Sequence, residues 1–456
     1  MIRRLAGRLV DLLGSYALAV SVLSLLFVLT LFGTLEQRYA SIYDVQTKYF
    51  ESLLLTDLRT GPDSSFPILL PGGYLLLALL GVNLAVGGVL RVRKSLPTLL
   101  LACGTVLLLG VVLPTISAGA MFVVAGLVTL LLFVVTGWAW PQADWGRLGV
   151  LVVHGGILML LAAGLVEFYA SDKGTLALAE VEGGPYRRAG DEFESYYEWD
   201  LVVAEHLEGG GVRERVVPFE RFEGLAPGES ARFEDAALPF DVRLSGFHRN
   251  CVVVQEREGG VDGLALRRLP PDPEKSERNE PGMLVTLLEK GPGGRTHRGL
   301  VHADQSFPWR VGVSREGRTQ AWDVDLRRRR WSFPFTLRLD EFVAAYHPGT
   351  TRPKEYSSRV TKMEEGSSEP ILITMNQPLR HKGYTFFQSS FEPSREVVTR
   401  EGRRVRTPPV SIFSVVRNPA DAWPLTACGI IMVGLAYMMG MKLAKHMRSE
   451  RARRAA

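Results

Sequence analysis

Cysteine is nearly absent from this chain, which has three Cys in 456 residues. So few thiols exclude a disulfide scaffold and a Cys-rich zinc or iron–sulfur protein. The net charge of +5 is small, so the overall charge does not indicate a nucleic-acid partner. The sequence also lacks the G-x-S-x-G, H-E-x-x-H, C-x-x-C and phosphate-loop motifs. We therefore propose no catalytic residue from motifs.

Charged side chains are missing from several long apolar runs. These runs contain no Lys, Arg or Asp, and Glu167 lies at an end. A membrane span needs about 20 mostly apolar residues, and unsatisfied backbone is costly in lipid. We therefore expect six transmembrane helices, at residues 16–33, 72–90, 97–116, 120–139, 149–168 and 424–441. If the hairpin 97–139 instead lies in the membrane interface, four spans remain.

Basic residues gather on one side of the expected spans. By the positive-inside rule, both termini are cytoplasmic and residues 170–422 lie outside. The first run is longer than a signal-peptide core and no A-x-A site follows it, so we expect an anchor. No Arg/Ser-rich transit peptide precedes it, which favours a multi-pass protein of a bacterial cell (inner) membrane. The basic residues are Arg3, Arg4 and Arg8, then Arg91, Arg93 and Lys94, and finally Lys442, Lys445, Arg448, Arg451, Arg453 and Arg454.

The chain divides into three expected parts. Residues 1–168 form a membrane region with five helices, and residues 423–456 hold the last helix and a basic cytoplasmic tail. Residues 169–422 show short alternating apolar runs between Gly, Pro and Asn turns, which predict mostly antiparallel β structure. The fold class is thus an integral α-helical membrane protein with a large extracytoplasmic β domain.

Two features of the outer domain leave alternatives open. Cys251 is the one cysteine there. It is either a buried structural residue, which we take as the default, or a thiol that contacts a partner's cysteines. We place the basic run Arg327–Arg330 on a turn between strands, as a solvated edge or as a contact for lipid head groups, haem propionates or an acidic partner.

His154 is a histidine within an expected span. It lies roughly 10 Å from Arg147 along the helix at ~1.5 Å per residue. An ionisable side chain at that depth needs a partner. Either it hydrogen-bonds to a neighbouring helix, for instance at Asn83, or it gives one axial bond to haem iron, whose equatorial ligands come with the porphyrin. Gly155 and Gly156 leave room for a flat ring or for another helix.

Seven segments of the sequence carry recognisable motifs. They are 32–37 (FGTLEQ), 48–52 (KYFES), 80–84 (LGVNL), the His154-Gly155 span, 174–178 (GTLAL), 353–358 (PKEYSS), and 376–390, which contains Asn376, Pro378, Gly383, Tyr384 and Gln388. Together these segments, which span most of the chain, resemble the ResB family, also called CcsB. Glu36 stands where the family commonly has Pro, Phe387 replaces the usual Tyr, and the hairpin 97–139 is extra.

The resemblance implies a subunit of the system II cytochrome c synthase complex. Such a subunit helps to carry or hold haem b, a transient substrate, and to deliver it to apocytochrome c outside the cytoplasm. His154 matches the family's haem ligand, with Gly155 and Gly156 beside the haem. The implied partners are a ResC/CcsA-type haem-channel protein, apocytochrome c, thiol-reducing pathway proteins and the lipid bilayer, but not nucleic acid. The chain lacks the Trp-rich loop of the ResC type, so we expect no complete enzyme.

Two other functions are weighed against this one. A membrane-anchored β domain that only binds partners fits the sequence if His154 is structural. A solute transporter fits less well, because no Asp or Lys lies mid-span and no inverted repeat is visible. We also expect Tyr384, Phe386, Phe387 and Gln388 to face the last span or the partner, with packing in the core of the outer domain as the alternative.

Overall fold

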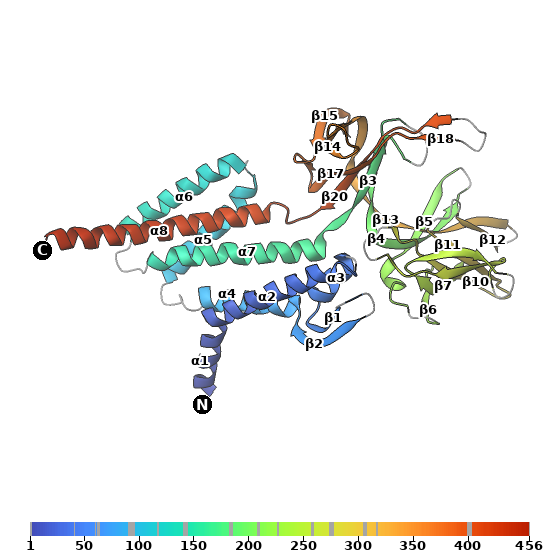
Figure 1. Cartoon of the computed structure of the whole chain (residues 1–456). Coiled ribbons are helices and arrows are strands. Elements are labelled where there is room, and N and C mark those ends of the chain that lie inside the picture. The colour runs from blue at the N-terminus through green and yellow to red at the C-terminus, as the bar shows by residue number, and fades with distance from the viewer. Residues whose placement is uncertain are drawn as a thin grey trace. The chain divides into compact units, whose positions relative to one another are not determined.

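The computed structural model describes residues 2–455, apart from 41, 60, 62–63, 90–95, 116–117, 140–144, 182–185, 208–209, 226–227, 257–259, 273–277, 304–307, 316–317 and 399–403. The chain forms two compact units (Figure 1). The helical unit comprises Met1–Ser171 and Asn418–Ala456, and the β unit comprises Asp172–Arg417.

The helical unit is built from apolar helices and one hairpin. The segment between the first two expected spans, which we took as a loop, contains the helix α3 and the antiparallel hairpin β1–β2. The helices are α1 (Ile2–Leu13), α2 (Tyr16–Glu36), α3 (Ile42–Tyr49), α4 (Gly73–Leu84), the π turn η1 (Ala85–Val89), α5 (Leu96–Val112), η3 (Leu113–Thr115), α6 (Ala118–Ala139), η4 (Trp145–Arg147), α7 (Leu148–Ala170) and α8 (Trp423–Ala455), and the hairpin is β1 (Leu54–Arg59) with β2 (Ser65–Pro71).

Four helices in the described part of the chain are long and apolar enough to cross a membrane. They are Tyr16–Glu36, Pro97–Thr115, Trp145–Ala170 and Trp423–Ala455. Two further apolar stretches, Gly73–Gly88 and Val123–Thr136, are shorter. The structure therefore supports a membrane protein with four such helices, and it does not confirm the expected number of six.

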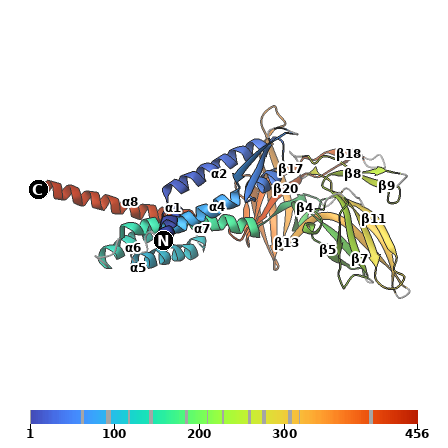
Figure 2. The ribbon, with the colours of Figure 1, turned by 90° about the horizontal axis from the view of Figure 1, so that it is seen from below.

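Small residues bring α7 and α8 into close contact (Figures 1 and 2). A methyl group at Gly149 of α7 would stand 2.6 Å from the carbonyl oxygen of Gly434 in α8. About two turns further along α7, a methyl group at Gly156 would stand 3.1 Å from the carbonyl oxygen of Ala427 in α8. Glycines at such spacing let helix backbones approach in lipid, where there is no hydrophobic force to drive helices together.

The β unit consists mainly of antiparallel strands, as expected. Its largest sheet has ten strands, with β15-β14-β13-β4-β3-β20-β17-β16 as the main path, and a four-stranded sheet follows the order β11-β10-β7-β6. The strands are β3 (Asp172–Ala179), β4 (Ala189–His206), β5 (Val212–Val217), β6 (Ser230–Phe233), β7 (Phe240–His248), β8 (Cys251–Gln255), β9 (Leu264–Arg268), β10 (Gly282–Glu289), β11 (Thr296–His302), β12 (Trp309–Arg315), β13 (Arg318–Tyr346), β14 (Pro353–Glu364), β15 (Ser367–Thr374), β16 (Leu379–His381), β17 (Tyr384–Glu392), β18 (Glu396–Val398), β19 (Arg404–Arg406) and β20 (Val410–Arg417), with the short helix η5 (Phe219–Arg221).

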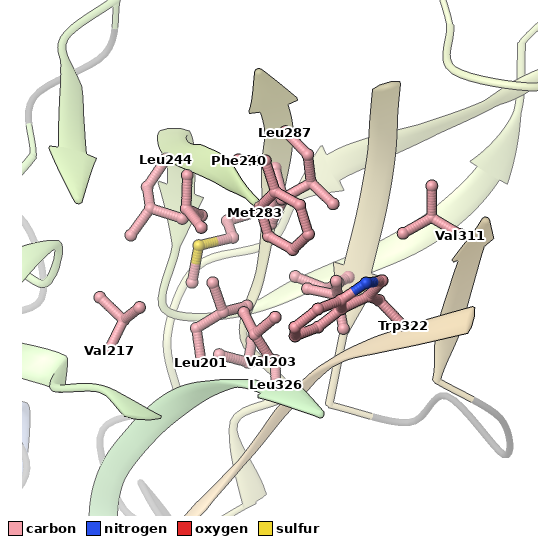
Figure 3. Close-up of a cluster of buried hydrophobic side chains, with 14 of the residues drawn as sticks. Leu201, Val203, Val217, Phe240, Leu244, Met283, Leu287, Val311, Trp322 and Leu326 are labelled. Carbon is pink, nitrogen blue, oxygen red and sulfur yellow. The ribbon is translucent and has the colours of Figure 1, made fainter. Parts of the chain in front are cut away.

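Two hydrophobic cores share the long strands β4 and β13. The first lobe has a core of side chains from β4, β5, β7, β10, β11, β12 and β13, which Figure 3 shows around Trp322 and Phe240. The second lobe has a core from β3, β4, β13 to β17 and β20. Trp322 of β13 lies in the first core and Phe335 of the same strand lies in the second. Each long strand therefore passes from one lobe into the other.

The basic run Arg327–Arg330 lies within β13, so our placement on a turn is wrong. It sits where β13 passes between the lobes, at a wide irregularity in which Ser195–Glu198 of β4 stand opposite a single residue, Arg329. Four consecutive charges hide the alternation that marks a strand. Acidic side chains of β4, β5 and η5 pair with three of these arginines. Arg329 bonds to Asp200, Glu198 and Glu220, Arg327 pairs with Glu214, Arg330 pairs with Glu194, and Arg328 lies over the Trp199 ring.

Candidate functional site

His154 lies on α7, seven residues from Arg147, and its side chain is half-buried. Its Nδ1 is 2.8 Å from the carbonyl oxygen of Val150, one turn earlier. A carbonyl oxygen can only accept, so Nδ1 carries the proton, and the neutral imidazole then has a free lone pair on Nε2. Among the described residues, no hydrogen bond to Nε2 is present. The side chain is thus oriented to offer one nitrogen ligand.

A π turn at the end of α4 lies against the His154 ring. After α4 the chain forms η1, which contains Gly87 and Gly88, and Gly88 is buried. A methyl group at Gly88 would stand 2.7 Å from Cδ2 of His154, so only glycine fits there without a shift. π turns within helices are frequent at functional sites. Sequence reasoning missed Gly88, and the one signal available was a Gly-Gly pair in an apolar run.

Gly155 and Gly156 contact neighbouring helices. A methyl group at Gly155 would stand 2.8 Å from Cγ2 of Val106 on α5. At Gly156 it would stand 2.7 Å from Cγ1 of Ile431 on α8. The sequence left open whether these glycines make room for a flat ring or for another helix. In the structure both glycines lie against another helix. A haem ligand role for this region therefore depends on His154 alone.

Asn83, the hydrogen-bond partner that we considered for His154, bonds elsewhere. It is buried, and its Nδ2 donates to the carbonyl oxygens of Leu13 at 2.7 Å and Ser15 at 3.0 Å. Ser15 also caps α2, because its Oγ accepts from the Leu18 amide at 3.1 Å. Asn83 thus fixes the corner between α1 and α2 and leaves His154 to other partners.

The two motif segments around the first span meet in a buried polar cluster. Glu36 is 3% exposed at the end of α2. Lys48 Nζ lies 3.0 Å from a Glu36 oxygen and 2.8 Å from Asp57 Oδ2, and Tyr49 Oη donates to Glu36 at 2.7 Å. Burial, with the nearby Glu36 carboxylate, raises the pKa of Tyr49. Glu36, the residue that departs from the family pattern, is therefore fully paired in a structural cluster.

The two outer motif segments also meet, 30 positions apart. Ser358 Oγ donates to Gln388 Oε1 at 2.6 Å, and Gln388 Nε2 donates to Ser411 Oγ at 2.9 Å. Both serines are fully buried and Gln388 is 6% exposed. These side chains join β14, β17 and β20 inside the second lobe. Because each of them has partners there, we assign the Ser358–Gln388–Ser411 cluster to folding.

The rest of the 376–390 motif forms a hairpin and part of the core. Lys382 and Gly383 both have positive φ, 47° and 80°, in a two-residue turn of the kind that favours glycine. Tyr384 packs against Phe193 and Phe333, and its Oη donates to the Ser332 carbonyl at 3.2 Å. The remaining positions, Asn376 and Pro378, lie exposed and half-buried respectively in the connection before β16. Core packing, the alternative that we weighed, describes Tyr384, Phe386 and Gln388.

Cys251 is fully buried in β8 beside Gly282. Burial raises the pKa of its thiol to about 12. The default interpretation of a buried structural cysteine agrees with this environment.

Cys251 should therefore react very slowly in the folded protein. In a variant with Cys103→Ala and Cys428→Ala, the remaining thiol should react with a charged maleimide at pH 8 roughly a thousandfold more slowly than an ordinary cysteine, because so little thiolate is present. Labelling followed by mass spectrometry, before and after unfolding in detergent and urea, measures this ratio. Fast labelling of the native protein would show that the thiol is accessible to a partner.

Within the described residues, His154 is a candidate for a single nitrogen ligand to a metal. Among the described residues, no group of three or more His, Cys, Asp or Glu is arranged to hold a metal ion. A lone imidazole suits an iron that arrives with a ring of ligands, as haem does. The Nε2 atom of His154, which makes no hydrogen bond to any described residue, and the half-buried ring fit that use.

The fold and site define a membrane protein with apolar helices, a large antiparallel β unit and a histidine, His154, in the middle part of a candidate membrane span. The model of the ResB-like family matches residues 299–406, from β11 to β19. Over these residues the match confirms the resemblance to the ResB family found in the motifs, and it includes the two segments that meet at Ser358 and Gln388. His154 lies outside the matched range. No curated protein matches the chain.

Proposed function

We propose that this chain is a ResB-like membrane protein of cytochrome c biogenesis that helps to hold haem during its transfer across the membrane. Haem is the substrate, attached afterwards to apocytochrome c outside the cytoplasm by the complete system II complex. The single observation that carries the proposal is the state of the His154 imidazole. Its Nδ1 donates to the carbonyl oxygen of Val150, and its Nε2 makes no hydrogen bond to any described residue. The match of residues 299–406 to the ResB-like family supports a role in cytochrome c biogenesis.

The residues around His154 prepare it for ligation. The Nδ1–H bond to Val150 sets the tautomer and the ring orientation, as a hydrogen bond behind a metal-bound histidine does. Gly88 lies against Cδ2 and limits rotation of the ring. Bound haem iron would take one axial bond from Nε2. The second axial ligand would come from a histidine of the ResC/CcsA-type partner, since among the described residues no second histidine lies beside His154.

The haem content of the purified complex tests this proposal. The full chain with its haem-channel partner should carry b-type haem with the low-spin spectrum of two imidazole ligands. A complex that assembles, supports maturation and never contains such haem would favour the other candidate, a membrane-anchored β domain that only binds partners. That candidate requires His154 to serve only helix packing, as Gly156 does where it contacts Ile431 of α8.

We further propose that six helices cross a bacterial cell (inner) membrane, with both termini in the cytoplasm. A reporter that is active only outside the cytoplasm should work when fused within residues 170–422 and fail when fused after Met441. Matched fusions of a reporter that is active only inside should give the opposite pattern. Outside activity at the C-terminal tail would make the number of spans odd and contradict the arrangement.

A further inference from the structure

The helix α1 has an apolar side with no partner among the described residues of this chain. Leu9 is 57% exposed and Leu12 is 61% exposed, although both are large apolar side chains. At 100° per residue Leu9 and Leu12 lie about 60° apart, and the exposed Asp11 lies about 160° from Leu9. The exposed Arg8 lies about 40° from Leu12, at the border between the apolar side and the polar side that holds Asp11. The sequence of α1 has three arginines and one aspartate. We expected only a basic segment here and no helix.

The direction of α1 is fixed by the helical unit. Two residues, Gly14 and Ser15, separate it from α2, and Figure 1 shows α1 turned sharply away from the α2 axis. Asn83 donates to the carbonyl oxygens on both sides of this corner. A methyl group at Gly14 would stand 3.2 Å from Cα of Gly87, so the corner lies directly on the π turn. α1 is therefore held at an angle to the first span and does not extend it.

Lipid is the partner that fits this side of α1. The next helix, α2, is a candidate membrane span whose exposed side chains include Phe27 at 69% and Leu31 at 47%. The apolar side of α1 thus begins two residues from a surface that faces acyl chains. Short amphipathic helices with basic polar faces lie in the plane of the interface, where arginine meets lipid phosphates.

We propose that α1 lies in the head-group layer of the membrane, on the side at which α2 begins, with Leu9 and Leu12 against acyl chains and Arg8 on anionic lipid phosphates. This proposal is independent of haem binding. It also explains the position of Asn83. The hydrogen bonds from this buried amide to Leu13 and Ser15 set the angle that keeps α1 parallel to the bilayer surface.

Spin labels in the full chain, reconstituted into lipid nanodiscs, test the position of α1. In the background with Cys103→Ala and Cys428→Ala, single labels are placed by Leu9→Cys, Leu12→Cys and, as the matched control on the polar side, Asp11→Cys. The ratio of oxygen accessibility to nickel-complex accessibility should be severalfold higher at 9 and 12 than at 11. Equal nickel accessibility at the three positions would place α1 in water and overturn the proposal. Protection of 9 and 12 from both reagents would show a protein partner and would overturn it as well.

The lipid phosphate contact needs a separate comparison. Discs of phosphatidylglycerol should increase the oxygen-to-nickel ratio at Leu9→Cys relative to discs of phosphatidylcholine, and Arg8→Gln should remove most of that increase. Arg8→Lys, which keeps the charge, should retain it. If the ratio is the same in both lipids, or if Arg8→Gln leaves the increase intact, the assignment of Arg8 to anionic head groups is wrong.

Discussion

Replacing His154 with alanine should leave the protein in the membrane and remove one axial ligand from the haem of the complex. Alanine costs less than histidine in lipid, so insertion is retained. The loss of a first ligand should reduce haem affinity by at least the ~10–100-fold that follows loss of an outer-shell partner. Haem content, the low-spin spectrum and cytochrome maturation should all decrease together.

Added imidazole should restore part of this loss. His154→Ala leaves a space the size of the ring beside Gly88, and free imidazole can enter it and bind iron in the same place. Leu160→Ala is the matched control, since it shortens an exposed side chain of the same helix and should leave the spectrum unchanged. A His154→Ala complex with the wild-type spectrum of two histidine ligands would eliminate His154 as the ligand, although the family match would stand.

Replacing Gln388 with alanine should destabilise the β unit and reduce the amount of protein. The change leaves a cavity in the second lobe and removes one hydrogen bond from each of two buried hydroxyls, Ser358 and Ser411, which then keep only the bond to each other. We expect a cost of about 2–4 kcal/mol in the free energy of unfolding. Thermal or urea unfolding of the full chain in detergent, with protein abundance in cells, measures it.

Ser389→Ala provides the control for Gln388→Ala. Ser389 is the next residue on β17, and its side chain is exposed. This change should alter stability by no more than about 0.5 kcal/mol. If Gln388→Ala protein is as abundant and as stable as the wild type but cytochrome maturation stops, our assignment of the cluster to folding is wrong. Reduced abundance with normal maturation per molecule is the expected outcome.

The helices were predictable to the extent that they are continuous and apolar. α7 begins and ends within two residues of the expected span, because nothing polar but His154 interrupts it. α1 was missed, since 12 residues with four charges match no span and no capping signal. β13 was divided in our prediction at Arg327–Arg330, because the pairing that makes it one strand comes from residues of β4 more than a hundred positions away.

The sequence predicted the functional group of the candidate site, the His154 imidazole, but not the residues that contact it. His154 stood out because an ionisable residue in a span is rare. The contact of Gly88 with its ring joins two helices 66 positions apart, and no local pattern encodes it. The same limit applies to Gln388. The motif was visible in the sequence, but only the folded lobe brings Ser358 and Ser411 to it.

The continuity of β13 has a consequence for how the β unit folds. This strand of 29 residues contributes to both hydrophobic cores, and β4, of 18 residues, does the same. Neither lobe is an autonomous folding unit, because a cut between them would remove strands from both cores at once. The segment that matches the family model, residues 299–406, contains β13 but not β4. It therefore marks a region of recognisable sequence rather than an independent domain, and both lobes should lose their structure in a single cooperative transition.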